Sequence, residues 1–215
     1  MNLSEAIEHL NKVAFTDDKT PLENALALNK EVILIDAGRS DFDVIVFGDL
    51  NEFKLFNNNY SHEAGDVAIR KVGEKIQEDV VTQIKARAFR QSGDEFIILL
   101  KQSQIKKFLS KTSYFASVTF LYKEKFLEAK MSFGYAVSDG KTNFSDLLER
   151  AETACLTAKT EGDGICVEWN SEVELNALVE KRHNCRQCGS VNKCYIPKKL
   201  SPEKLKVCAF CGKNL

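Results

Sequence analysis

Residues 43–66 read DVIVFGDLNEFKLFNNNYSHEAGD and contain the clearest structural pattern in the chain. The run from Asp43 to Asp49 is rich in β-branched and aromatic residues and ends on polar ones, which predicts a buried strand. From His62 to Val80 apolar residues recur at helical spacing, which predicts an amphipathic helix. We therefore expect Asp49 at the carboxyl end of a strand, followed by a polar connection and a helix.

Strand and helix patterns alternate through the rest of the chain. Short apolar runs at Ala88–Arg90 and Phe96–Leu100 flank polar residues 91–95, which predicts a hairpin. The other expected helices cover Ser4–Phe15, Leu22–Lys30 (begun by Pro21), Gln104–Lys111, Phe144–Thr160 and Ser171–Glu180. The other expected strands lie within Val118–Leu121, Ala129–Val137 and Ile165–Trp169. Residues 31–37 fit either a longer helix or a strand. The alternation predicts an α+β fold with one mixed sheet covered by helices.

Bulk composition is that of a globular protein. The 215 residues are 44% hydrophobic and 28% charged, and the length suits one good-sized domain with a small appendage. The first residues lack the pattern of a secretory signal, and no apolar run approaches the roughly 18–20 residues that span a bilayer. We therefore expect a cytoplasmic protein with no membrane partner.

Charge and cysteine are unevenly distributed. Residues 181–215 contain nine Lys or Arg and a single acid, Glu203, so residues 1–180 hold 21 basic and 30 acidic side chains. Five of the seven cysteines also lie in the last 31 residues. Cys155 and Cys166 lie in an apolar helix and strand, where core packing is expected. The C-terminal part is therefore expected to be a separate, basic module.

Two Cys-x-x-Cys-Gly units, separated by 19 residues, characterise this module. Such units favour a metal site over a disulfide, and four thiolates form a closed tetrahedral Zn²⁺ site. The expected ligands are Cys185, Cys188, Cys208 and Cys211. A redox dithiol would not explain two matched units, and His183 and Cys194 are weaker candidates as ligands. The lysines of this zinc ribbon either contact nucleic acid, a protein partner or the acidic body, or are simply solvated.

Two acidic positions stand out in the N-terminal part. Asp49 ends its strand, and Asp94 and Glu95 occupy the hairpin turn. A strand end and a hairpin tip can bring carboxylates together, and hard oxygen ligands of this kind hold Mg²⁺ beside nucleotide phosphates. Taken alone, a turn with solvated acidic residues is the commoner explanation.

The residues between these positions resemble the diguanylate cyclases, whose usual pattern is D-x-D-x-F-K-x-x-N-D-x-x-G-H-x-x-G-D. The matching positions are Asp49, Phe53, Lys54, Asn57, His62, Gly65 and Asp66. Downstream, residues 92–96 (Ser-Gly-Asp-Glu-Phe), preceded by Arg90, resemble the hairpin that names the GGDEF family. Several separated motifs in the right order are far more specific than one short match.

Three further segments extend the resemblance over about residues 15–170. Residues 17–24 are similar to D-x-L-T-G-L-x-N, residues 131–136 to S-x-G-x-A, and residues 151–162 to A-D-x-A-L-Y-x-A-K-x-x-G. The resemblance implies a palm-like mixed sheet of the nucleotide-cyclase type. The expected domains are a cyclase domain over residues 1–170 with an N-terminal helix at 1–15, a connecting helix over 171–183, and the zinc ribbon over 184–215.

The resemblance also implies roles for the matching residues. Mg²⁺ or Mn²⁺ would be held by Asp49, Asp94 and the main-chain carbonyl of Leu50. The implied catalytic residues are Asp94, Lys54 and Glu95, and Asp94 is favoured as proton acceptor or metal ligand. The implied substrate-binding residues are Phe53, Asn57, His62, Asp66, Gly93 and Lys159. Asn57 and Asp66 would read the guanine edge, while Phe53, Lys54 and Lys159 would face the triphosphate.

The implied activity is that of a bacterial signalling enzyme, a nucleotidyltransferase that condenses two GTP molecules into cyclic di-GMP and pyrophosphate. One protomer would bind one GTP, so catalysis would need a homodimer.

Several positions depart from the family pattern. Ser92 replaces the first glycine of GGDEF. Asn51 replaces the second aspartate of D-x-D, and Asp163 stands where the family usually has a phosphate-binding arginine. Gln83 and Ala86 replace the upstream R-x-x-D motif, so product feedback through it is not expected. These departures leave room for weak activity, another product, or binding without catalysis.

Three other functions therefore remain open beside the cyclase. They are a non-catalytic GTP or cyclic-dinucleotide sensor that signals through the ribbon, a nucleic-acid-binding regulator built around the ribbon, and a cyclase with a different cyclic product. The enzyme is favoured by retention of Asp49, Lys54, Asn57, Asp66 and Asp94. Asn51 and Asp163 favour the sensor.

Overall fold

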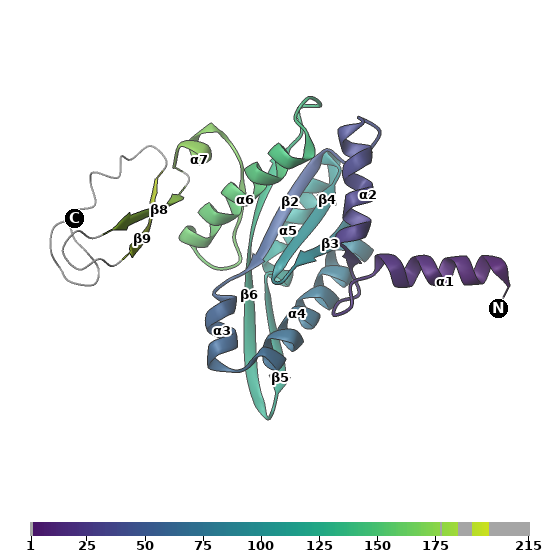
Figure 1. Ribbon diagram of the computed structural model, residues 1–215, viewed down its shortest axis with the longest axis horizontal. Coiled ribbons are helices and arrows are strands. Elements are labelled where there is room, and N and C mark those ends of the chain that lie inside the picture. Colours follow the sequence, from purple (N-terminus) through teal and green to yellow (C-terminus); the bar gives the residue numbers. More distant parts are fainter. Residues whose placement is uncertain (1, 177, 185–190, 198–215) are drawn as a thin grey trace.

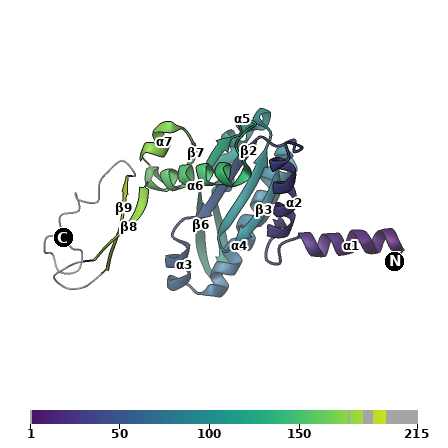
Figure 2. The same cartoon turned by 45° about the horizontal axis from the view of Figure 1, so that its top comes forward.

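The computed structural model describes residues 2–176, 178–184 and 191–197. Within them, one seven-stranded sheet lies between two layers of helices, and a separate two-stranded hairpin follows toward the C-terminus (Figure 1 and Figure 2). The helices are α1 (Leu3–Phe15), α2 (Ala25–Asp36), α3 (Phe53–Asn59), α4 (His62–Ile76), α5 (Ile105–Phe115), α6 (Phe144–Glu161) and α7 (Ser171–Asn176). A π-helical turn, Gln77–Thr82, extends α4, and a 3₁₀ turn, Gln102–Gln104, precedes α5.

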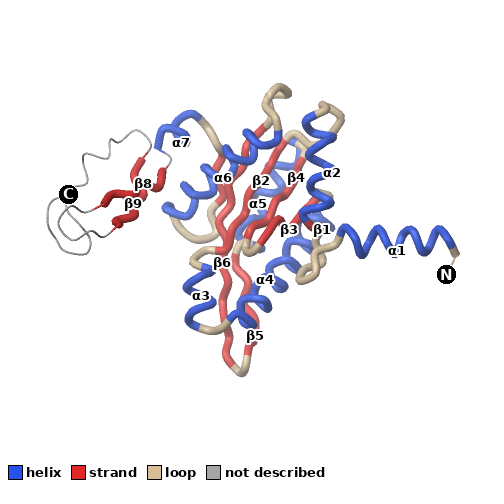
Figure 3. The backbone as a smooth tube through the Cα atoms, in the orientation of Figure 1, coloured by secondary structure: helices blue, strands red, loops and turns tan. Residues whose placement is uncertain are grey.

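The sheet is mixed, as predicted. Its strands are β1 (Glu23–Asn24), β2 (Val44–Leu50), β3 (Arg87–Ser92), β4 (Glu95–Leu100), β5 (Ser117–Tyr122), β6 (Lys125–Val137) and β7 (Cys166–Glu168). Their order is β1-β3-β4-β2-β6-β5, with β7 beside β6. The β1–β3 and β6–β7 pairs are parallel and the others antiparallel. The β5–β6 hairpin extends beyond the rest of the sheet, near α3 (Figure 3).

Alternate residues of β2 face the two helical layers. Val44 and Val46 belong to a core that includes residues of α4 and α5. Ile45 and Phe47 belong to a second core, which includes residues of α2 and α6 and the buried Cys155. A strand that is buried on both faces needs a continuous apolar run, and this run is why β2 could be predicted as a buried strand from its sequence.

The helix expected after Pro21 has different boundaries. The helix predicted from Leu22 begins instead at Ala25, because Asn24 caps it by accepting a hydrogen bond from the Ala27 main-chain N–H at 3.1 Å. It continues to Asp36, so residues 31–36 are helical.

The expected connecting helix over residues 171–183 is wrong from Leu178 onward. Residues Leu178–Asn184 form a strand, β8, which pairs antiparallel with β9 (Val191–Pro197). The four predicted zinc ligands, Cys185, Cys188, Cys208 and Cys211, lie outside the described residues.

Helix α1 projects away from the body of the domain (Figure 1). Its apolar side chains Leu3, Ile7, Leu10 and Val13 are 51–78% exposed. Within the described residues, none of the helices combines the length and apolar character needed to cross a bilayer.

Candidate active site

The carboxyl end of β2 meets the turn between β3 and β4. Asp49 pairs with Glu95 in the antiparallel register, and the Leu50 main-chain N–H donates to the Asp94 carbonyl oxygen at 3.3 Å. Gly93 adopts φ +48° in this turn, and no described atom lies within 4 Å of the position a Cβ would take. Acidic residues that are distant in the sequence therefore share one corner of the sheet, which we call the acidic corner (Asp49, Asp94 and Glu95).

Lys159 of α6 reaches the acidic corner and forms an ion pair with Asp49. Burial is the largest influence on the Asp49 carboxyl and raises its pKa. Lys159 lowers that pKa, whereas the charges of Asp94 and Glu95 raise it, and the net pKa lies above its usual value. The corner thus carries more negative charge than Lys159 neutralises. A bound cation would relieve that excess.

The donor set suits a metal that also binds substrate. In the described part of the chain, no three His, Cys, Asp or Glu side chains converge as a complete metal site. Mg²⁺ is commonly bound by one or two carboxylates, with waters and substrate phosphates completing the coordination. Two carboxylates and the Leu50 carbonyl are therefore a partial donor set that suits Mg²⁺ or Mn²⁺, with water and nucleotide phosphate left to complete the coordination.

Glu152 of α6, which was not among the site residues predicted from the sequence, lines the same site. A cavity of about 260 Å³ is bordered by Phe47, Asp49, Glu95, Glu152, Cys155, Leu156 and Lys159. Burial raises the pKa of Glu152, and the charges of Glu95 and Glu149 raise it further. The signal was present in the sequence, since Glu152 follows Ala151 where the family helix pattern has its aspartate.

Two departures from the family pattern contact each other. The Asn51 side-chain amide donates to Asp163 Oδ1 at 2.8 Å, and Lys130 Nζ donates to Asp163 Oδ2 at 3.0 Å. Hydrogen bonds from Lys130 and then Asn51 lower the pKa of Asp163. An aspartate at position 51 would repel Asp163, so the two exchanges are physically coupled.

The connection between β2 and α4 carries the residues expected to contact nucleotide. Glu52 has φ +51°, a left-handed conformation that turns the chain directly into α3. Phe53 packs against the first core, whereas Lys54 is exposed and forms no ion pair with any described residue. His62 is exposed at the first turn of α4.

Asn57 of α3 lies against Gly65 of α4. A Cβ on Gly65 would lie 1.9 Å from Asn57 Oδ1, so only glycine leaves room for this side chain. That oxygen is buried and has no hydrogen-bond partner among the described residues. Asp66 follows Gly65 on α4 and is partly exposed. Asn57 and Asp66 therefore offer hydrogen-bonding capacity that a ligand could satisfy. We call these two residues the base group, because the family resemblance implies that they contact the guanine base.

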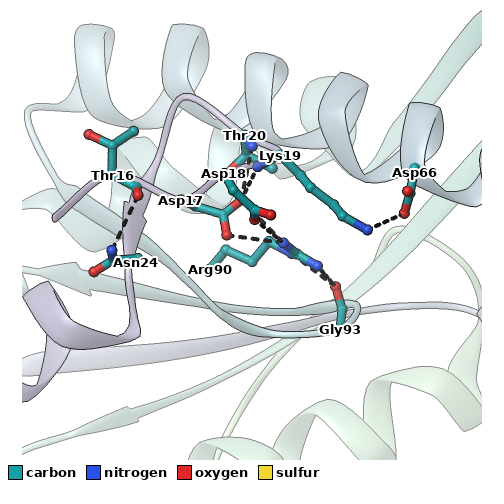
Figure 4. A network of polar contacts seen from close by, with 9 residues as sticks. All are labelled: Thr16, Asp17, Asp18, Lys19, Thr20, Asn24, Asp66, Arg90 and Gly93. Atoms are coloured by element: carbon teal, nitrogen blue, oxygen red, sulfur yellow. Dashed lines mark hydrogen bonds and ion pairs between the residues drawn. The ribbon is translucent and has the colours of Figure 1, made fainter. Parts of the chain in front are cut away.

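Arg90 ties the N-terminal turn to the β3–β4 hairpin (Figure 4). Its Nη1 lies 3.0 Å from Asp17 Oδ2, and its Nε and Nη2 donate to the Gly93 carbonyl oxygen at 3.0 and 2.9 Å. Both side chains of the ion pair are only 10% exposed. Burial raises the pKa of Asp17, but the hydrogen bond from Thr20, the charge of Arg90 and main-chain hydrogen bonds outweigh it and lower the net pKa.

The expected residues thus form two groups rather than one cavity. The space beside Asp49 does not include Asn57, His62 or Asp66. Phe53 and Lys54 lie between the acidic corner and the base group along the chain.

A mixed sheet between helices, with acidic residues where a central strand meets a hairpin turn, defines the class of nucleotide-cyclase-like α+β domains. The sequence profile described as "Diguanylate cyclase, GGDEF domain" matches residues 14–164. The chain belongs to this family.

Curated relatives are longer than this chain. It is 28% identical over 217 residues to the bifunctional diguanylate cyclase/cyclic di-GMP phosphodiesterase MucR of Pseudomonas aeruginosa, covering 94% of this chain and 31% of MucR. It is 27% identical over 130 residues to diguanylate cyclase DosC of Escherichia coli K12, covering 58% of this chain and 28% of DosC. The chain therefore spans less than a third of the length of either relative.

Solved structures support the fold. Diguanylate cyclase SiaD of Pseudomonas aeruginosa, in complex with its activator SiaC, matches with a TM-score of 0.65 at 19% identity, covering 77% of this chain and 66% of SiaD. The coiled coil and GGDEF domain of DgcB from Caulobacter crescentus, in complex with c-di-GMP, matches with a TM-score of 0.63 at 21% identity, covering 77% and 91% of the two chains. The predicted α+β architecture is confirmed.

Proposed function

We propose that residues 1–170 form a diguanylate cyclase that condenses two GTP molecules into cyclic di-GMP. The observation that carries the proposal is the acidic corner beside Lys159, in a chain of the GGDEF family. In each condensation the 3′-hydroxyl oxygen of one GTP bonds to the α-phosphorus of the other. The bond from that phosphorus to the β-phosphate oxygen breaks, and one pyrophosphate and one proton are released.

Asp49, Asp94 and the Leu50 carbonyl would hold Mg²⁺ or Mn²⁺. The metal would lower the pKa of the attacking hydroxyl and neutralise charge on the leaving group. The Glu95 carboxylate accepts a hydrogen bond from Ser92 Oγ at 2.8 Å, whereas the Asp94 side chain forms no hydrogen bond with any described residue. Asp94 is therefore the better-placed proton acceptor or metal ligand.

The triphosphate would face the segment that joins the acidic corner to the base group. Lys54 has no competing ion pair with any residue that the structure describes and would be available to a phosphate, while Lys159 would connect Asp49 with the β/γ-phosphates. The main chain at Phe53 would contact phosphate, Gly93 would let the hairpin approach it, and His62 would lie beside the substrate. Asn57 and Asp66 would read guanine.

Because one domain binds one GTP, we propose that catalysis needs a homodimer. The exposed residues Leu3, Ile7 and Leu10 of α1 form a stripe with the spacing of a helix–helix seam. The helix itself projects from the body (Figure 1). This stripe is the surface that we assign to self-association.

Incubation with GTP and Mg²⁺ is expected to yield cyclic di-GMP and pyrophosphate, identified by chromatography and mass spectrometry. A parallel incubation with ATP would reveal a different cyclic product. If neither nucleotide gives a product over a range of protein concentrations, the enzyme assignment fails.

A non-catalytic GTP or cyclic-dinucleotide sensor is the second candidate. One observation favours it: Asp163 replaces the family arginine and is already paired with Lys130. This side of the site therefore offers the triphosphate less positive charge than the family pattern does. GTP binding without product formation would select the sensor.

We also propose that the C-terminal residues form a zinc ribbon that binds a protein partner or nucleic acid. Support comes from the two matched Cys-x-x-Cys-Gly units and from the β8–β9 hairpin, because Cys185 and Cys188 lie in the segment that joins its strands. Metal analysis is expected to find one Zn²⁺ per chain, lost in Cys188→Ser and retained in the matched control Cys194→Ser. Full zinc content in Cys188→Ser would contradict the ligand assignment.

A further inference from the structure

We propose that Lys19 acts together with Asp66 in base recognition, donating a hydrogen bond to the O6 atom of guanine. The inference rests on the proposed function and adds a specificity-determining residue to its nucleotide site. Lys19 stands at the leucine position of the D-x-L-T-G-L-x-N pattern. A leucine cannot donate a hydrogen bond, so this position gives the site a donor that the family pattern lacks.

The contact between the two side chains is direct. Lys19 Nζ lies 2.5 Å from Asp66 Oδ1, although the residues are 47 positions apart (Figure 4). The side chains are 36% and 49% exposed, so both remain accessible to a ligand. An ammonium group has three donors, and the described residues use one of those of Lys19. The pair therefore presents an acceptor, the Asp66 carboxylate, next to a free donor, the Lys19 ammonium.

Lys19 is held in place by the turn on which it lies. Asp17 Oδ1 accepts hydrogen bonds from the main-chain N–H groups of Lys19 at 3.2 Å and Thr20 at 2.9 Å, and from Thr20 Oγ1 at 2.8 Å. The ion pair between Asp17 and Arg90 anchors this turn to the β3–β4 hairpin. The main chain of Lys19 is thus fixed by contacts that do not involve Asp66.

The same turn packs on the helix that carries Asp66. A Cβ on Gly73 would lie 2.5 Å from Thr20 Cβ, so the turn lies directly against α4 at this glycine. Asp66 and Gly73 are separated by two helical turns and share one face of α4. Lys19 therefore reaches Asp66 along the face on which its own turn is seated.

The order of donor and acceptor matches guanine. Guanine presents the N1–H and N2–H donors beside the O6 acceptor, which suits a carboxylate next to an ammonium. Adenine presents an acceptor at N1 and the donor N6–H₂ in place of O6, so both contacts would be mismatched. A site built from such polar groups rejects the base that leaves them unpaired.

Lys19→Met tests the inference, with Lys19→Arg as the matched control that keeps the donor. The probes are 3′-deoxy-GTP, 3′-deoxy-ITP and 3′-deoxy-ATP with Mg²⁺, because they lack the attacking hydroxyl and allow titration without turnover. Lys19→Met is expected to weaken the binding of 3′-deoxy-GTP about tenfold, which is the usual effect of losing one charge-assisted hydrogen bond. Hypoxanthine, the base of 3′-deoxy-ITP, keeps O6 and N1–H, so the binding of 3′-deoxy-ITP should weaken by the same factor. The binding of 3′-deoxy-ATP should not weaken. Lys19→Arg should stay within about threefold of the unaltered protein for all three.

Asp66→Ser separates this role from that of Asp66. It removes the acceptor for N2–H, which hypoxanthine lacks, so it should reduce the preference for 3′-deoxy-GTP over 3′-deoxy-ITP. Lys19→Met should leave that preference unchanged. If Lys19→Met binds 3′-deoxy-GTP as well as or better than the unaltered protein, Lys19 is a bystander or a competitor for Asp66, and the inference is overturned. If the unaltered protein binds no 3′-deoxy-GTP at all, the proposed function fails as well.

Discussion

Asp94→Asn is expected to lower cyclic di-GMP formation about 10³-fold or more, a loss of about 4 kcal/mol of transition-state stabilisation. The substitution keeps the size of the side chain but removes the charge that would bind metal or accept the proton. The Leu50 N–H bonds to the main-chain oxygen of Asp94, so the hairpin should keep its structure. Initial rates with GTP and Mg²⁺, together with circular dichroism, check both expectations.

Asp41→Asn is the matched control for this charge removal. Asp41 is 83% exposed and lies 3.3 Å from Lys101, on a surface ion pair outside the acidic corner. Such pairs contribute roughly 0–1 kcal/mol to stability, so turnover should be nearly unchanged. Unaltered turnover in Asp94→Asn would show that the metal lies elsewhere and would remove the main support for the proposed function.

The fold was predictable where one local signal dominates. The apolar run of β2 and the polar turn at residues 91–95 gave a strand and a hairpin at nearly the correct residues. The start of α2 was missed because Pro21 suits a first helical turn, whereas Glu23 and Asn24 pair with β3 and Asn24 then caps the helix. The strand β8 was missed because its pairing partner is β9, and a partner strand is not visible in a local pattern.

The site was predictable only as far as the family motifs extend. Those motifs located the acidic corner and the base group, but they did not reveal which side chains touch. Lys19 with Asp66 and Asn51 with Asp163 are contacts between residues 47 and 112 positions apart, which depend on how the elements pack. The sequence showed Asn51 and Asp163 as two separate losses, whereas the structure shows one coupled exchange that also involves Lys130.

Gly134→Ala is expected to destabilise the domain by about 3 kcal/mol or more, because overpacking against main-chain atoms cannot be relieved by a rotamer change. Gly134 lies on β6 beneath α6, and a Cβ there would lie 2.0 Å from the Cys155 nitrogen and 2.2 Å from the Ala151 carbonyl oxygen. Its φ is not in the left-handed region, so the cost is steric rather than conformational. This contact explains why the strand pattern S-x-G-x-A has glycine at this position.

The same substitution should also disturb the acidic corner. Helix α6 carries both Glu152 and Lys159, so moving it away from β6 would pull Lys159 from Asp49. Gly140→Ala is the matched control: no described atom lies within 4 Å of the added Cβ, and its φ of +75° should cost only about 1 kcal/mol. Urea unfolding of both variants measures the difference. Equal losses of stability would mean that α6 does not pack on β6 as closely as these distances require.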